Sequence, residues 1–250
     1  MDDIALAAWL AGEAGSTLLE IQRSAPADEI GTRALKDRGD RESQLLLARL
    51  LKEHRPADAV LSEEAADDAS RLTADRVWII DPLDGTREFS EGRDDWAVHV
   101  ALWSDGDLIA GAVALPGIGR VLTSADEAPQ WEPPSRIRLA VSRSRATPLV
   151  QALADELDAE LVPMGSAGYK VAAVVRGEVD AYVHTGGQYE WDSAAPVAVA
   201  RGAGLFTSRV DGSELRYNGD NPYLPDLVVC NPSLADDLLA RVDELMKKES

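Results

Sequence analysis

Two aspartates three residues apart follow the apolar run Val77–Ile80, in the segment Asp81-Pro82-Leu83-Asp84-Gly85-Thr86. An apolar run that ends in acids predicts a buried strand carrying carboxylates to a sheet edge. Pro82 restricts the turn, so Asp81 and Asp84 are expected to reach the same side and share metal ions. The backbone carbonyl of Leu83 adds an oxygen donor of the kind Mg²⁺ prefers. The segment predicts metal-assisted chemistry on a phosphate.

Gly85 and Thr86 stand where a helix is expected to start. Their amides would face an anion, and the threonine hydroxyl would orient a water molecule. The same residues also fit an ordinary Asp–Gly turn with a threonine that caps a helix. Spacing alone leaves both interpretations open.

Two further acidic segments are candidates for the same site. Ser62-Glu63-Glu64 ends an apolar run, and strand ends are where sites of layered α/β folds collect. Glu63 is the stronger ligand candidate, because adjacent acids do not easily face one ion and Glu64 also fits a helix start or a solvated turn. Asp192 follows Trp191 and precedes an apolar helix, a pattern that by itself is most simply a helix N-cap.

The elements that must position these residues follow from hydrophobic periodicity. The first part predicts helices over 2–24 and 41–54 and strands at 59–61, 77–80, 97–103, 108–115 and 120–123. A polar, proline-containing break at 128–134 is the linker candidate. The second part predicts strands at 138–142, 160–162, 179–183 and 204–207 and helices at 147–158, 168–176, 192–202 and 232–248. We therefore expect an α+β half (residues 1–134) and an α/β half (135–250) with a cleft between them.

Composition narrows the class of partner. The chain has 250 residues, 44 acidic against 25 basic, and a net charge of -19, which disfavours nucleic acid polymers and anionic lipid. The same charge repels a small phosphate ester unless some carboxylates hold divalent cations. No apolar run approaches the ~18 residues of a membrane span, and the acidic start Met1–Asp3 is unlike a signal peptide. We expect a cytoplasmic globular protein.

The single cysteine and the three histidines are expected to be structural. Cys230 lies in the apolar run Leu227–Cys230 and is predicted to be a buried core thiol. None of His54, His99 and His184 has the context of a nucleophile elbow, and nothing in the chain resembles a serine triad.

The segments Ser62-Glu63-Glu64, Asp81–Thr86 and Trp191-Asp192, in this order, resemble the signature of the inositol monophosphatase superfamily of Mg²⁺-dependent phosphatases. The resemblance implies a layered αβαβα sandwich of the inositol monophosphatase and fructose-1,6-bisphosphatase type. It also implies two or three Mg²⁺ ions held by Glu63, Asp81, the carbonyl of Leu83, Asp84 and Asp192. Asp40 stands where the family keeps a further aspartate, so the resemblance makes Asp40 and Thr86 the pair that activates the attacking water.

The resemblance also implies that the second half selects the substrate. A glycine-rich loop leading into a helix with a lysine, Gly165–Lys170, suits a second phosphate, and it is similar to the loop of CysQ-type 3′-phosphoadenosine 5′-phosphate phosphatases. The resemblance implies substrate contacts from Ser166, Lys170 and Ser144, besides Gly85, Thr86 and Asp192. Arg145 departs from the histidine of that subgroup.

The resemblance implies a phosphatase that converts 3′-phosphoadenosine 5′-phosphate to AMP in sulfate assimilation, acting on its sulfated relative as well, as a monomer or homodimer. The rival is the same chemistry on inositol phosphates or fructose 1,6-bisphosphate. A non-enzymatic alternative is an acidic protein that only binds divalent metal.

Overall fold

Two five-stranded sheets form the framework of the protein, whose computed structural model describes residues 1–143 and 146–249. The first sheet is made by the first half of the chain and has the order β1-β2-β3-β4-β5. Its strands are β1 (Ala59–Ser62), β2 (Arg76–Asp84), β3 (Ala97–Ser104), β4 (Asp107–Leu115) and β5 (Arg120–Thr123). Strand β1 pairs parallel to β2, and the other neighbours are antiparallel. The five strands predicted for this half are confirmed.

The second sheet has the order β10-β12-β8-β6-β7 and lies wholly beyond residue 137. Its strands are β6 (Arg138–Ser142), β7 (Glu160–Met164), β8 (Ala181–His184), β10 (Phe206–Ser208) and β12 (Leu227–Cys230). Strand β12, which the sequence analysis treated only as an apolar run, pairs antiparallel with both β8 and β10. A short antiparallel pair, β9 (Gln188–Tyr189) with β11 (Tyr223–Leu224), lies outside this sheet.

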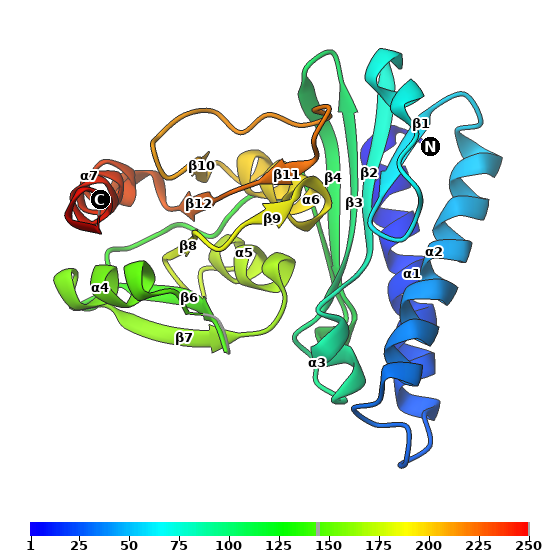
Figure 1. Cartoon of the computed structure of the whole chain (residues 1–250), viewed down its shortest axis with the longest axis horizontal. Helices are drawn as coiled ribbons and strands as arrows, with labels where there is room; N and C mark the ends of the chain where they lie inside the picture. The colour runs from blue at the N-terminus through cyan, green and yellow to red at the C-terminus, as the bar shows by residue number, and fades with distance from the viewer. Residues whose placement is uncertain (144–145, 250) are drawn as a thin grey trace.

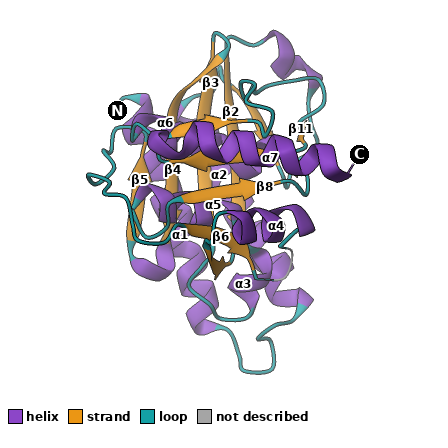
Figure 2. Cartoon of the chain, turned by 90° about the vertical axis from the view of Figure 1, so that its left-hand side faces the viewer, coloured by secondary structure: helices purple, strands orange, loops and turns teal. Residues whose placement is uncertain are grey.

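Helices cover both faces of each sheet, which gives five layers (Figure 1). The helices are α1 (Asp3–Ser24), α2 (Arg33–His54), α3 (Thr86–Ser90), α4 (Pro148–Glu156), α5 (Ala167–Val175), α6 (Glu190–Gly202) and α7 (Ala235–Glu249). The pair α1 and α2 lies outside the first sheet, α5 and α6 lie between the sheets, and α4 and α7 lie outside the second sheet, as the turned view in Figure 2 also shows. The predicted αβαβα sandwich is confirmed.

Alternating side chains along the strands explain this layering. On β2, Trp78 and Ile80 belong to the core shared with α1 and α2, whereas Val77 and Ile79 belong to the core shared with α5 and α6. Strand β12 divides in the same way between the middle and outer layers. Strands that are buried on both faces read as continuous apolar runs, which is the pattern of Val77–Ile80.

Helix α1 has the length and mean hydropathy of a membrane-crossing helix. Its Leu6, Leu10 and Leu18 are nevertheless fully buried in the core that α1 shares with α2 and the first sheet. It is therefore a core helix of the sandwich.

Two predicted helix starts were wrong by more than two residues. Helix α2 begins at Arg33 and not at residue 41, because Thr32 caps it by accepting a hydrogen bond from the Leu35 amide at 3.3 Å. Its first turns consist mostly of polar residues, so the sequence there shows no clear helical repeat of apolar positions. Helix α7 begins at Ala235 and not at 232, because Pro232–Leu234 forms a separate 3₁₀ turn.

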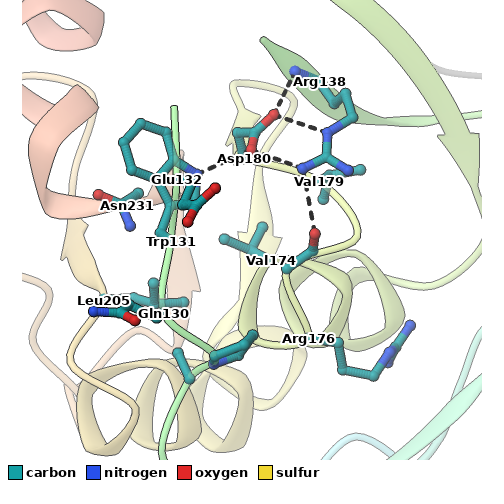
Figure 3. A pocket seen from close by; sticks show the side chains of 13 residues that line it. Gln130, Trp131, Glu132, Arg138, Val174, Arg176, Val179, Asp180, Leu205 and Asn231 are labelled. Atoms are coloured by element: carbon teal, nitrogen blue, oxygen red, sulfur yellow. Dashed lines mark hydrogen bonds and ion pairs between the residues drawn. The ribbon is translucent and has the colours of Figure 1, made fainter. Parts of the chain in front are cut away.

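The linker expected at 128–134 crosses the end of α5, where it closes a pocket of about 250 Å³ (Figure 3). Trp131 Nε1 donates a hydrogen bond to Asp180 at 3.0 Å, and the same carboxylate pairs with the Arg138 guanidinium at 2.9 Å. The linker is thus anchored to the second half. The boundary proposed between the two halves of the chain, after residue 134, lies at the end of this segment. Helix α6 of the second half nevertheless packs on the first sheet.

Cys230 is fully buried, as predicted, and burial raises the pKa of its thiol to about 12. Since the thiolate is the reacting species, we expect the native thiol to react with Ellman's reagent at least about a hundredfold more slowly than the thiol in urea. The measurement is absorbance during labelling with and without urea. Comparable rates in the two conditions would contradict the burial of this strand.

Candidate active site

A β-bulge at the end of β2 brings the two aspartates of the central motif to one face. Asp81 lies opposite His99 of β3 and Asp84 lies opposite Ala97, so β2 has one residue more than β3 between these pairs. In a regular strand residues 81 and 84 would point to opposite faces. The bulge reverses that alternation and turns both carboxylates toward α5 and α6. Leu83 then points the other way and is buried among the helices of the first layer.

Asp192 completes an acidic cluster from the other half of the chain. One carboxylate oxygen each of Asp81, Asp84 and Asp192 lies within 4.8 Å of the others. Asp192 is not the N-cap that the isolated pattern suggested. It lies in the first turn of α6, and its carboxylate accepts a hydrogen bond from the amide of Tyr189, the actual N-cap, at 2.6 Å.

The proximity of these carboxylates alters their acidity. Burial and the charges of Glu63 and Asp84 raise the pKa of Asp81. Burial and Asp84 raise the pKa of Asp192 to about 6, and burial and Asp192 raise that of Glu63 to about 7. Carboxylates so arranged repel one another. The positive charge of a hard divalent cation relieves that repulsion, and such a cation prefers oxygen ligands. The donor set therefore fits a hard divalent cation.

Asp84 is the member of the cluster whose anion the protein supports most. Burial opposes its ionisation, yet His99, the Gly168 amide and Lys170 hold its pKa below the usual value. The backbone amides of Ala167 and Gly168, in the first turn of α5, donate to its two oxygens at 3.2 and 2.6 Å. The positive end of α5 thus faces this carboxylate.

Asp40 and Thr86, which the sequence analysis paired, lie together although they come from different helices. Burial with the charges of Glu64 and Asp37 raises the pKa of Asp40 to about 7, and the nearby Thr86 hydroxyl opposes this rise. Thr86 Oγ1 itself donates to the carbonyl of Leu83 at 3.4 Å. Thr86 begins α3 directly after Gly85, whose φ of 92° is in the left-handed region. A side chain at Gly85 would lie 2.9 Å from Cβ of Ser166, so only glycine fits there without a shift.

These residues meet at a cleft of about 780 Å³. The predicted site residues that line it are Glu63, Asp84, Gly85, Thr86, Ser166, Lys170 and Asp192. The structure therefore brings residues of both halves to one cavity. Ser144 and Arg145 lie outside the described residues.

The side chains of Ser166 and Lys170 make their described hydrogen bonds within the loop and the start of α5. Ser166 caps α5 by accepting from the Tyr169 amide at 3.0 Å. The ammonium of Lys170 donates to the carbonyls of Gly165 and Ser166 and lies 5.2 Å from the centre of the Tyr182 ring. Lys170 is only 4% exposed, and this burial lowers its pKa to about 8. Lys170 is therefore not a solvated helix residue.

Sequence reasoning missed a buried ionic network beside the cleft. Arg71, 1% exposed, donates to Asp67 at 2.6 Å, to the side chain of Asn218 at 2.7 Å and to the carbonyl of Gly219 at 2.9 Å. Glu190, next to the Trp191-Asp192 pair, accepts from the amides of Asn218 and Gly219. The network ties the segment after Glu63 to the start of α6. Because its members are up to 148 positions apart in the chain, no local sequence pattern predicts this network.

The raised pKa values predict an unusual pH dependence of stability for the metal-free protein. Asp40, Glu63 and Asp192 have ordinary pKa values of 3.8 to 4.5 and folded values of about 6 to 7. Between these limits the folded state binds more protons than the unfolded state, so stability falls as pH rises. We expect Tm in EDTA to be lower at about pH 7.5 than at about pH 5 by more than ~2 °C, the shift that ~1 kcal/mol produces in a chain of this size.

Mg²⁺ should raise Tm more at the higher pH, where the carboxylates are ionised. Asp192→Asn should flatten the pH dependence, whereas Asp28→Asn, at an exposed acid, should not. A metal-free Tm that is equal or higher at pH 7.5 would contradict the electrostatics described here.

Known proteins are similar to this chain in sequence and architecture. The model of the inositol monophosphatase family matches residues 4–247. A 3′-phosphoadenosine 5′-phosphate phosphatase of Mycobacterium leprae is 50% identical over 259 aligned positions, which cover 98% of this chain and 95% of the relative. The 3′(2′),5′-bisphosphate nucleotidase CysQ of Escherichia coli O157:H7 is 29% identical, with coverage of 86% and 94%.

Among solved structures, CysQ from Bacteroides thetaiotaomicron has a TM-score of 0.79 at 26% identity and covers 92% of this chain and 97% of its own. An inositol monophosphatase of Thermotoga maritima has the same fold, with a TM-score of 0.79 at 20% identity and full coverage of both chains. The family model spans nearly the whole chain, and the motifs at 62–64, 81–86 and 191–192 meet in one cleft. This protein belongs to the inositol monophosphatase family.

Proposed function

We propose that the protein is a Mg²⁺-dependent phosphatase that removes the 3′-phosphate of 3′-phosphoadenosine 5′-phosphate, giving AMP and phosphate. The observation that carries the proposal is the cluster of Asp81, Asp84 and Asp192 beside a cleft of about 780 Å³. Phosphatases of 3′-phosphoadenosine 5′-phosphate from two mycobacteria, 50% and 49% identical to this chain, support the choice of substrate.

Two or three Mg²⁺ ions would be held by Glu63, Asp81, Asp84 and Asp192 together with the carbonyl of Leu83. When bound, such ions polarise the phosphoryl oxygens and make a water molecule more acidic. The negative charge of the carboxylates would retain the ions. The bound ions would in turn offset the repulsion between this acidic chain and a phosphate ester.

Asp40 and Thr86 would handle the proton of the attacking water. Thr86 lines the cleft, and its hydroxyl lies near enough to the Asp40 carboxylate, whose pKa is about 7, to favour the ionised form. A base with this pKa is substantially ionised at neutral pH and still basic enough to accept a proton. Thr86 would orient the water and Asp40 would take up its proton.

The other end of the substrate would be held by the loop that carries Ser166 and Lys170. The Lys170 ammonium donates hydrogen bonds to carbonyls of this loop and places a positive charge in the wall of the cleft. That charge favours a second phosphate, with Gly85, Ser166, Asp192 and Ser144 as further contacts. Inositol phosphates and fructose 1,6-bisphosphate are the rival substrates, because the same cluster would serve them.

We place this activity in the cytoplasm, within sulfate assimilation, with the sulfated analogue of the substrate as a second target and a monomer or homodimer as the active form.

Phosphate release from a substrate panel tests the proposal. With Mg²⁺ we expect faster release from 3′-phosphoadenosine 5′-phosphate than from inositol 1-phosphate or fructose 1,6-bisphosphate, and none in EDTA. Asp84→Asn should lose at least about a hundredfold in rate while its circular dichroism is unchanged, because a charged ligand becomes a neutral one. Unchanged release by Asp84→Asn would refute the metal-site assignment. A preference for inositol 1-phosphate would refute the nucleotide assignment alone.

Thr86→Val and Asp40→Asn separate an enzyme from a protein that only binds metal. Each should lower kcat by about 10²- to 10⁴-fold with little change in KM, because proton transfer is impaired. Calorimetry should find Mn²⁺ binding retained in both variants. In the parent protein kcat should fall as pH drops below about 7, where Asp40 becomes protonated. The matched variant Asp28→Asn should keep full activity, and wild-type turnover by Thr86→Val would exclude this role.

A further inference from the structure

His99 lies beside the acidic cluster, on the face of β3 that meets α5 and α6. Its side chain is fully buried. Its Nδ1 is 3.0 Å from the carbonyl oxygen of Trp191, and its Nε2 is 3.1 Å from Oδ2 of Asp84. Because Nδ1 faces a carbonyl oxygen, Nδ1 must carry a hydrogen and donate it, which fixes the orientation of the ring.

The contacts of His99 with Asp84 and Trp191 join the two halves of the cluster, and its Nδ1 is also 4.0 Å from Oδ2 of Asp81. Asp84 belongs to β2 in the first sheet, whereas Trp191 immediately precedes Asp192 in α6. The ring also lies directly across the β2–β3 pairing from Asp81. One imidazole therefore spans the distance between the strand that carries Asp81 and Asp84 and the helix turn that carries Asp192.

Gly168 holds the ring in this place from the α5 side. A Cβ at Gly168 would lie 1.9 Å from Nε2 of His99, a distance that no side chain tolerates without a shift. The Gly168 amide meanwhile donates to the same oxygen of Asp84, at 2.6 Å. His99, Gly168 and Asp84 are thus packed as one unit, in which none can move alone.

We propose that His99 is a positioning residue that sets the spacing between Asp84 and Asp192 and thereby the affinity of the cluster for divalent cations. Groups that hydrogen-bond or contact metal ligands orient them, and their loss weakens metal affinity by about 10- to 100-fold. The inference rests on the proposed function only in that the cluster binds a divalent cation. It does not depend on the identity of the substrate.

Direct binding of Mn²⁺, measured by calorimetry without substrate, tests this role. His99→Leu fills the buried site with an apolar side chain but loses the contacts with Asp84 and the Trp191 carbonyl. We expect its Mn²⁺ affinity to fall by about 10- to 100-fold. His99→Asn, which retains a hydrogen-bond donor, should lose less. His54→Leu, at an exposed histidine whose ring meets Trp9 edge to face, should bind Mn²⁺ as the parent does. A purely structural role would lower the metal-free Tm and leave the affinity of the folded protein unchanged, an outcome that would overturn the proposal.

Gly168→Ala provides a second test that leaves His99 in the chain. Its methyl group should displace the ring and weaken Mn²⁺ binding, whereas in the His99→Ala background the same methyl group has space. We therefore expect the double variant to bind Mn²⁺ no more weakly than His99→Ala alone. Independent losses that multiply in the double variant would contradict a shared mechanism. Absence of Mn²⁺ binding by the parent protein would instead refute the metal site of the proposed function.

Discussion

Mutual repulsion among three crowded carboxylates is the constraint on which the rest of this structure depends. Asp81 and Asp84 are buried, and Asp192 lies within 4.8 Å of both. Like charges at such distances in a poorly solvated place are stable only with compensation. The protein supplies part of it through the amides of α5 and through His99, both directed at Asp84. The negative charge that these groups leave uncompensated would attract a divalent cation.

The five-layer architecture makes this crowding possible. Each sheet is covered on both faces, so the ends of β2 and α6 are held by apolar cores and not by the charges themselves. Helix α6 packs on the first sheet although it belongs to the second half of the chain, which brings Asp192 to the end of β2. The buried Arg71 network adds a polar tie between the same two regions. Rigid packing on both sides lets the site hold an arrangement that its own electrostatics oppose.

Much of the fold was predictable because its strands and helices have clear local patterns. Runs such as Val77–Ile80, apolar on both faces, and the leucine repeats of α1 and α2 required nothing beyond the sequence. The errors arose where local chemistry outweighed periodicity, at the polar first turns of α2 and at the 3₁₀ turn before α7. Lys170 and Ser166 were expected at the cleft, and they lie there, but their described hydrogen bonds to the loop were not foreseeable. Those bonds depend on how the loop folds back on itself.

The sequence by itself determined the residue types of the site, their order, and the strand end that carries Asp81 and Asp84. It also determined the family, because the motifs around Glu63, Asp84 and Asp192 are local in the chain. Only the tertiary structure decided how these motifs meet. The bulge that turns Asp84 to the face of Asp81, the histidine that joins Asp84 to the turn of Asp192, and the Arg71 network all depend on contacts between distant segments. Such contacts arise from the packing of layers, for which a local sequence pattern carries no signal.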